Sequence, residues 1–531
     1  MAIPSKKAQR YDRQLRLWGD HGQNALESAQ VCLINASATG TEILKNLVLP
    51  GVGTFTIIDN KLVTQSDFGS NFFVTADSLG TNRGKVALTL LQELNSDVRG
   101  EAIDDNFESV LSTNPDFFSK FSVVVATELP EDKLLHLSQV LWKFSTPLLV
   151  ACAYGLMGYV RIAVQEHEII ESHPDNYHED LRLDCPFPAL QSHVESIDLD
   201  ALDNSQHSNI PFLVILFKYL QIWKNSHGGL IPKNYHEKKE FKEIIKVGIR
   251  MNEDGVPLDE ENFDEAITNV NSLILATRIP SAVQSILEAT SCTCITPESG
   301  DFWLLARALR EFVACEGSGL LPLRGSIPDM TSSSDMYVEL QRVYQTKARA
   351  DMEAVAGHLS QLLTSIGKPT NAISEEYIKL FCRNSAFLQV LRYRTLEEEL
   401  QTPNIEELRM HLENPDSDML YYVLLRAAHQ FYSLHKVYPG TEEGQFISDI
   451  GHMKSIVSGL LQKWGLLASP VREDYIIEFC RYGGGEIHAV AAFIGGVAAQ
   501  EVIKVITHQF VPLNNTLIYN ATTSTTVTVV L

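Results

Sequence analysis

The sequence lacks paired cysteine motifs, long apolar runs and an excess of positive charge. Its eight cysteines are scattered without a CxxC pair, which argues against a structural zinc site, and most lie in apolar patterns typical of reduced, buried thiols. The longest apolar runs, 210–217 and 489–499, are too short to span a bilayer. With 43 Lys and Arg against 66 Asp and Glu, the net charge of −23 argues against a nucleic-acid backbone as the main partner.

The opening residues MAIPSKKAQRYDRQ also lack the apolar segment of a signal peptide. Together with the scattered cysteines, this predicts an intracellular protein. We expect a cytoplasmic location, with the nucleus left open as a second one.

The 531 residues are enough for two or three domains. Strands alternate with helices over residues 1–170, which predicts a doubly wound, mostly parallel α/β sheet. Residues 171–485 carry almost only helical patterns, and 486–531 return to α/β character with a helix of small apolar residues followed by short β-type runs. We interpret the chain as one α/β domain that is interrupted by a large all-helical insertion and completed by the tail.

Two glycines are missing from the turn of the first strand–helix–strand unit, residues 29–59. A nucleotide-binding turn would read GxGxxG, and the three positions here hold Asn35, Ser37 and Gly40. Asn35 tolerates the positive φ of the turn, and Gly40 allows the helix to pack closely on the strand. The Cβ of Ser37, however, stands where bare backbone would approach a phosphate, and a carboxylate, Asp59, ends the second strand. We interpret this unit as a nucleotide-binding fold that has lost its nucleotide; an ordinary unit that never bound one is the alternative.

Five segments carry a resemblance to a known family. They are YDRQLRLWG at 11–19, INASATGTEILKNLVLPGVGTFTIID at 34–59, ESHPDN at 171–176, LPLRGSIPDM at 321–330 and AAFIGGVAAQEVIK at 491–504. With these segments in order along essentially the whole chain, the sequence is similar to activating enzymes for ubiquitin-like modifiers. Within that family it resembles the regulatory, non-catalytic subunits of heterodimeric neddylation-activating enzymes. The resemblance implies a degenerate, Rossmann-like adenylation domain of ThiF type.

An active domain of this family uses MgATP to activate the C-terminal carboxylate of the modifier, and the resemblance assigns each ATP-binding position to a residue here. The ribose acid falls on Asp59, the phosphate arginine on Ser70 and the phosphate lysine on Arg83. The metal-binding aspartate falls on Leu129, with Glu128 as a substitute. Since most groups that would touch ATP are changed, we expect this chain to bind no cofactor or metal, and the partner subunit to bind MgATP.

The family also needs an accessible, activated cysteine, usually followed by threonine, to take the modifier as a thioester. Cys185 lies in LDCPFPAL without that threonine, and Cys315 ends a predicted helix, so neither fits. We therefore predict that the chain is not an enzyme on its own.

In the resembled heterodimers the degenerate domain donates an arginine across the interface to the ATP phosphates of the other subunit. Arg13 of YDRQL matches that position, with Arg16 as a weaker, supporting candidate. The alternative is that both arginines are simply solvated side chains.

The resemblance implies three partners: a catalytic subunit, a Nedd/Rub-type modifier and, indirectly, a conjugating enzyme, in the first step of cullin neddylation. The loop 320–335 and the helix after it are predicted to face the catalytic subunit, or else to form a solvated linker. The predicted contact residues are Arg324, Asp329, Met330, Tyr337 and Gln341. Alternatives for the whole chain are a scaffold or adaptor, an independent nucleotide-dependent enzyme, and a regulatory subunit for sumoylation, which the helical insertion argues against.

Overall fold

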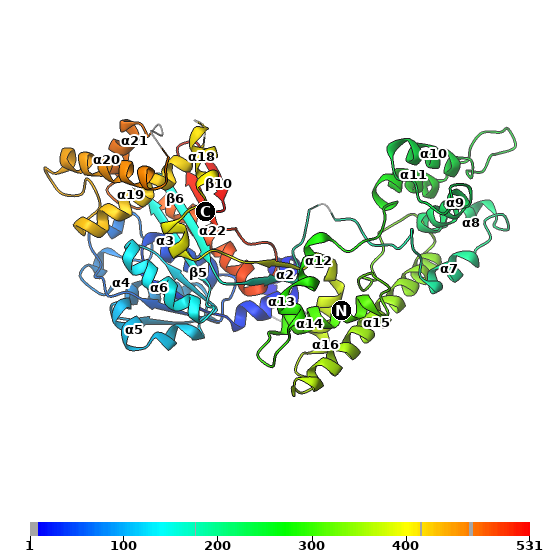
Figure 1. The fold of residues 1–531 in the computed structure, drawn as a ribbon, viewed down its shortest axis with the longest axis horizontal. Helices are drawn as coiled ribbons and strands as arrows, with labels where there is room; N and C mark the ends of the chain where they lie inside the picture. Colours follow the sequence, from blue (N-terminus) through cyan, green and yellow to red (C-terminus); the bar gives the residue numbers. More distant parts are fainter. Residues whose placement is uncertain (1–8, 176, 415–416, 467–470) are drawn as a thin grey trace. The chain divides into compact units, whose positions relative to one another are not determined.

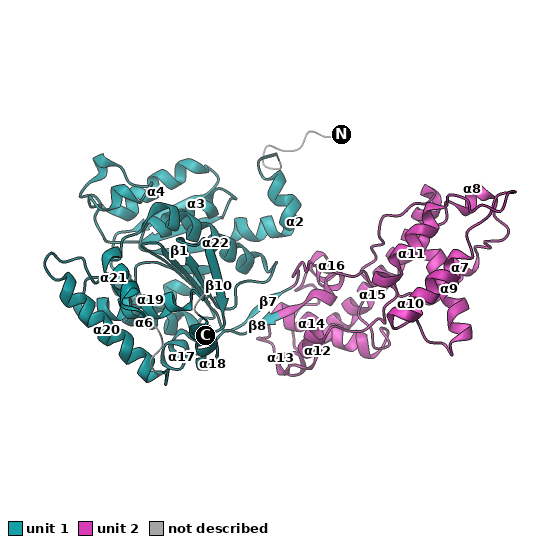
Figure 2. Cartoon of the chain, turned by 90° about the horizontal axis from the view of Figure 1, so that it is seen from above, with its two compact units in different colours: residues 1–169, 390–531 teal, residues 170–389 magenta. Residues whose placement is uncertain are grey.

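Two compact units make up the protein, seen in a computed structural model that describes residues 9–175, 177–414, 417–466 and 471–531. Residues 1–169 and 390–531 form the first unit, and residues 170–389 form the second (Figure 2). The first unit is built from both ends of the chain, whose blue and red segments lie together in Figure 1. The predicted split of the α/β domain is therefore confirmed.

An eight-stranded sheet forms the centre of the first unit, in the order β10-β9-β6-β5-β4-β1-β2-β3. The strands β1 to β5 are parallel, and β6, β9 and β10 pair antiparallel at one end. Because β1 lies between β2 and β4, the strand order reverses there, which is where ligand sites form in such sheets. The strands are β1 Gln30–Ile34, β2 Thr54–Ile58, β3 Arg99–Ile103, β4 Val123–Ala126, β5 Leu148–Tyr154, β6 Met157–Ala163, β9 Thr516–Asn520 and β10 Thr525–Val529.

Helices cover both faces of this sheet. Val31 and Leu33 of β1 belong to one buried cluster, and Cys32 and Ile34 belong to another on the opposite face. This alternation confirms the predicted doubly wound α/β fold. The helices of the first unit are α2 Asp12–Ser28, α3 Ala38–Val48, α4 Arg83–Leu94, α5 Phe107–Thr113, α6 Glu131–Lys143, α17 Leu396–Gln401, α18 Ile405–Glu413, α19 Met419–His435, α20 Phe446–Lys463, α21 Glu473–Tyr482 and α22 His488–Thr507, with short 3-10 turns at Asp67–Gly69, Ala76–Ser78 and Pro115–Lys120.

The helix α22 is the predicted helix of small apolar residues, and it packs along α3. A Cβ on Gly495 would lie 2.6 Å from the Cβ of Glu42, so the missing side chain permits this close approach. Among the described residues, α22 is also the one helix long and apolar enough to cross a membrane, but 56% of that window is buried inside the fold. We interpret it as a core helix whose small residues serve an internal contact.

The segment 390–485 requires a correction to the predicted domain boundaries, because it belongs with the sheet and not with the insertion. Arg161 of β6 and Glu399 of α17 form a fully buried ion pair. Tyr422 of α19 donates a hydrogen bond to Glu399 at 3.1 Å. Helical periodicity reports only local structure, so it could not show that these distant residues pair and that the insertion ends at Gln389.

The second unit is helical, as the sequence patterns predict. Its helices are α7 Pro188–Glu195, α8 Asn204–His207, α9 Phe212–Ser226, α10 Tyr235–Lys246, α11 Glu261–Leu273, α12 Ser281–Glu288, α13 Thr290–Thr293, α14 Asp301–Ala314, α15 Ser334–Ser365 and α16 Glu375–Arg383, with a 3-10 turn at Ser385–Phe387. A separate two-stranded sheet pairs β7 His167–Ile169 with β8 Gln389–Leu391.

The loop 320–335 is packed against the helices of the second unit. Leu321, Leu323 and Ile327 are buried. The amide of Leu323 donates to the carboxylate of Asp351 on α15 at 3.1 Å. The alternative of a solvated linker is therefore wrong for this loop.

Candidate functional site

The turn between β1 and α3 lies at the reversal of strand order and keeps the shape of a nucleotide-binding turn. Asn35 has a φ of +64°, as its predicted place in the turn requires. A Cβ on Gly40 would lie 2.8 Å from the carbonyl oxygen of Asn35, so only glycine allows α3 to start this close to β1. Ser37 is buried and caps α3 by accepting a hydrogen bond from the Gly40 N–H at 3.1 Å. The scaffold is retained, with a side chain where a phosphate would need open space.

A carboxylate of the chain itself occupies the N-terminal end of α3. Glu486, two residues before α22, accepts the N–H groups of Ala38 at 2.7 Å and Thr39 at 3.2 Å. It also accepts the hydroxyls of Thr39 at 2.5 Å and Ser37 at 3.2 Å. In a nucleotide-binding turn of this type, the free N–H groups and the helix dipole at this end bind phosphate. Glu486 therefore supplies the negative charge that a phosphate would supply.

The charge of this carboxylate changes near neutral pH. Burial raises the pKa of Glu486 to about 7, the charge of Glu128 raises it further, and hydrogen bonds from Thr39 and Ala38 oppose the rise. The four donors around the carboxylate favour its ionised form, but burial and the charge of Glu128 outweigh them, so the folded protein holds the proton more tightly than the unfolded chain.

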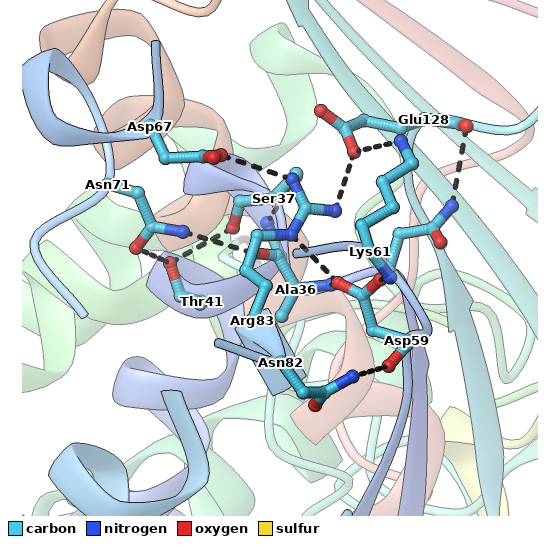
Figure 3. A network of polar contacts seen from close by, with 12 residues as sticks. Ala36, Ser37, Thr41, Asp59, Lys61, Asp67, Asn71, Asn82, Arg83 and Glu128 are labelled. Atoms are coloured by element: carbon cyan, nitrogen blue, oxygen red, sulfur yellow. Dashed lines mark hydrogen bonds and ion pairs between the residues drawn. The ribbon is translucent and has the colours of Figure 1, made fainter. Parts of the chain in front are cut away.

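The side chain of Arg83 lies beside the turn and forms several ion pairs there (Figure 3). Only 4% of it is exposed. Its guanidinium donates to Asp59 at 2.8 Å, to Asp67 at 3.3 Å and to Glu128 at 2.9 Å. Lys61 also contacts Glu128 at 2.9 Å. Burial raises the pKa of Glu128, but Arg83 and Lys61 outweigh it and lower that pKa to about 2. The arginine at the predicted phosphate-lysine position is thus held by the chain's own carboxylates.

Asp59, the predicted ribose acid, has both carboxylate oxygens in use. One oxygen accepts the Ala36 N–H at 2.8 Å together with the Arg83 contact, and the other accepts the Lys61 N–H at 2.9 Å. The residue is 2% exposed. The resemblance places a ribose at this acid, but here the acid orders the turn.

The remaining positions of the ATP site are equally changed. Leu129 is a buried apolar side chain that offers no metal ligand, and Glu128, the substitute, is held in the Arg83 network. Ser70 is half-buried, and its amide donates to the Asp67 carbonyl at 3.3 Å. The structure brings Asp59 and Arg83 together but does not turn either of them toward open space.

The side chain of Arg13, unlike that of Arg83, is open to solvent. The residue is exposed on α2, and its side chain has no hydrogen bond or ion pair within the described part of the chain. Arg16, by contrast, pairs with Asp12 at 3.0 Å on the same helix. Arg13 is therefore available to another protein, whereas Arg16 is partly engaged.

The two cysteines considered from the sequence are both exposed. Cys185 is exposed, and burial of its sulfur and the neighbouring Asp184 raise the pKa of the thiol, which keeps it protonated. Cys315 is exposed at the C-terminal end of α14.

The residues predicted to contact a partner have internal roles as well. The Arg324 guanidinium lies over the rings of Tyr177 at 5.1 Å and Phe387 at 5.2 Å. Met330 and Tyr337 pack against the core of the second unit, while Asp329 is exposed and Gln341 half-buried. Their contact with a partner stays a prediction.

Glu486 is the important residue that the sequence analysis missed. It is separated from Ser37 by 449 residues, so no local pattern links them. The available signal was an acid directly before a helix that packs on α3.

The fold and the turn define the class, and comparison with known proteins agrees: the ThiF family model matches residues 11–530, so the chain belongs to the ThiF family. Within it, the chain is similar to proteins named "NEDD8-activating enzyme E1 regulatory subunit". The protein of Xenopus laevis is 53% identical over 98% of each chain. That of Gallus gallus is 51% identical over 99% of each, and that of Drosophila melanogaster 40% over 99% of this chain and 97% of its own. The chain is thus a member of the NEDD8-activating enzyme E1 regulatory subunit family, as the motifs predicted.

Proposed function

We propose that this chain is the regulatory subunit of a heterodimeric activating enzyme. Its catalytic partner binds MgATP, adenylates a NEDD8-type modifier and takes the modifier as a thioester on its own cysteine, the first step of cullin neddylation. The observation that carries the proposal is the closed turn, in which the Glu486 carboxylate takes the place of a phosphate and Arg83, at the predicted phosphate-lysine position, pairs with Asp59. A chain closed in this way contributes no nucleotide site, so its contribution is to the partner.

The surface near α22 supports pairing with another subunit. Phe72, Ile487 and Phe493 are exposed by 65%, 43% and 40%, and the ring of Phe72 stacks on His488 at 3.6 Å. Exposed aromatic and aliphatic side chains of this size are typical of protein interfaces. We propose that these side chains contribute to the contact with the catalytic subunit.

Arg13 is proposed to act in trans on the ATP of the partner. A guanidinium is planar and always charged, so it stabilises the charge that spreads over phosphoryl oxygens in the transition state. Its exposure and its lack of an internal partner among the described residues support this role.

Calorimetry tests the closed site. The isolated chain titrated with MgATP is expected to give no heat of binding, while the reconstituted heterodimer binds one nucleotide through the catalytic subunit. Tight binding to the isolated chain would instead favour an independent nucleotide-dependent enzyme.

Modifier-dependent ATP–pyrophosphate exchange by the reconstituted heterodimer tests Arg13. Arg13→Ala is expected to leave assembly intact and to slow exchange by about 10³-fold or more, as for removal of an arginine finger. The matched control is Arg409→Ala, which removes an exposed arginine of α18 and is expected to have no effect. An unchanged rate for Arg13→Ala would favour a scaffold or adaptor, and exchange driven by a sumoylation modifier would favour that pathway.

The cellular location is proposed to be the cytoplasm, with the nucleus as a second compartment. Fractionation of cells expressing the tagged chain together with its catalytic partner checks this.

A further inference from the structure

Three metal-ligating side chains meet in the second unit, away from the closed turn. Among the described residues, Cys315, Glu316 and His358 form a group whose sulfur, carboxylate oxygen and ring nitrogen all lie within 4.8 Å of one another. Cys315 ends α14, Glu316 follows it, and His358 projects from α15, which packs along α14. The group therefore joins two helices of one compact unit.

Local structure holds these donors in place. The amide of Cys315 still donates to the Glu311 carbonyl at 3.0 Å, and the next turn closes through Gly317 N–H to the Phe312 carbonyl at 2.7 Å. A Cβ on Gly317 would lie 2.4 Å from the Leu320 carbonyl oxygen, so the chain winds tightly here. The donors sit on this fixed turn and not on a free loop, which lowers the entropy cost of gathering them around an ion.

The electrostatics favour a cation. The C-terminal end of a helix carries a partial negative charge, and Cys315 and Glu316 lie at that end of α14. The Nε2 of His358 lies 2.8 Å from the Glu316 carboxylate, so the two groups are already close enough to bind one ion.

We propose that Cys315, Glu316 and His358 bind a zinc ion. Zinc accepts thiolate, imidazole and carboxylate ligands at about 2.0–2.3 Å in a tetrahedron, so its ligand atoms lie roughly 3.3–3.8 Å apart. The three donor atoms lie within 4.8 Å of one another, close to that spacing. Calcium and magnesium prefer oxygen ligands and do not suit a sulfur–nitrogen–oxygen set.

Zinc binding requires deprotonated ligands, so it releases a proton. The Cys315 thiol loses its proton to solvent, and Nε2 of His358 gives up its hydrogen bond to Glu316 so that both groups bind the ion. Water fills the fourth position, because the site is open to solvent. The ion would join the end of α14 to the C-terminal third of α15, a role separate from modifier activation.

Cobalt titration of the full chain, stripped of metal with a chelator, tests the site. One equivalent of Co²⁺ is expected to give the visible bands of a tetrahedral ion with a thiolate-to-metal charge-transfer band, and Zn²⁺ should displace it. Cys315→Ser should abolish the charge-transfer band, and His358→Gln should weaken binding by at least about tenfold, since loss of a second-shell partner alone costs about 10–100-fold.

The matched control is Cys294→Ser, which removes another exposed cysteine of the second unit. This variant should keep the bands, and zinc should raise the melting temperature of the wild type and of Cys294→Ser but not of Cys315→Ser. Metal-free melting curves verify that each variant is folded. The proposal is overturned if the wild type shows no charge-transfer band, or if Cys294→Ser removes the band and Cys315→Ser keeps it.

Discussion

The N-terminal end of α3 and the C-terminal end of α14 both carry a partial charge, and the protein covers only one of them. The N-terminal end of α3 carries free N–H groups and positive partial charge, and Glu486 of the same chain covers it. The C-terminal end of α14 carries negative partial charge; the exposed Cys315 and Glu316 follow it, and the half-buried His358 of α15 lies beside them. The first end is closed by the chain, and the second is open to an ion.

This difference shows how the loss of a ligand site becomes fixed in a structure. At α3 the positions that would contact a nucleotide are satisfied from within, by Glu486 for the helix end and by Asp59, Asp67 and Glu128 for Arg83. Once buried charges depend on one another, removal of one leaves its partners unpaired. The donors at the α14 end are joined by the exposed His358–Glu316 contact and by no buried ion pair, so they are free to change partners.

The largest loss of stability is expected at Arg83, whose buried ion pairs lie beside the N-terminal end of α3. Arg83→Met should lower the free energy of unfolding by about 3–5 kcal/mol, because Asp59 and its neighbours lose their counter-charge in a buried site. Urea denaturation of the full chain measures it. The control Lys85→Met, two residues further along α4, removes an exposed pair with Asp104 and should cost at most about 1 kcal/mol. Equal costs for both variants would contradict the closed-site interpretation.

A smaller loss is expected from uncovering the α3 end itself. Glu486→Ala should cost about 1–2 kcal/mol, because the N–H groups of Ala38 and Thr39 lose their acceptor while water regains partial access to the half-buried position. The same denaturation experiment compares it with Glu478→Ala, which removes an exposed i,i+3 pair on α21. If the two variants are equally stable, Glu486 does not act as a cap.

Sequence patterns predicted most of the fold because parallel strands and amphipathic helices are local. The alternation expected over residues 1–170 appears as the parallel strands β1 to β5 with their helices, and the helix expected after the loop 320–335 appears as α15. The pattern is weakest in the helix α10, because its buried positions are few, Phe241 and Ile245, among charged residues. The end of the insertion was misplaced because it depends on the distant Arg161 pairing.

The candidate site was predictable only in part, for the same reason. Substitution of the glycines at Asn35 and Ser37 is visible in the sequence and indicates a changed turn. What replaces the phosphate is not visible, since Glu486 comes from the far end of the chain. The α14 group is equally hidden, because His358 follows Glu316 by 42 residues and forms no CxxC-type spacing.

The stabilisation that Glu486 provides at the α3 end is expected to depend on pH. Its folded pKa of about 7 lies above the ordinary value of 4.5, so the proton binds more tightly in the folded protein. Its stabilising contribution is then complete below about pH 4.5 and is lost as the pH rises through 7. The stability advantage of wild type over Glu486→Gln should shrink by about 1 kcal/mol in total from pH 5 to pH 8. Each pKa unit corresponds to about 1.4 kcal/mol, and the total is set below the full shift because solvent screens a residue that is only partly buried.

Unfolding free energies at several pH values in this range provide the measurement. Glu128, with a pKa of about 2, and the buried His429, with a pKa lowered to about 4 by burial and Arg426, do not titrate between pH 5 and 8. Both proteins also share these groups, so they cancel in the difference. A constant difference across the range would show that Glu486 has an ordinary pKa.

The smallest change in stability is expected at the C-terminal end of α14 in the metal-free protein. Cys315→Ser should change the free energy of unfolding of the metal-free chain by no more than about 0.5 kcal/mol, because the side chain is exposed and caps no buried group. Denaturation in the presence of a chelator measures it beside Glu486→Ala. A loss as large as that of Glu486→Ala would mean that the α14 end is also closed by its own chain. The contrast between a covered and an uncovered helix end therefore depends on Cys315 being nearly neutral in the metal-free protein and becoming stabilising only when zinc is added.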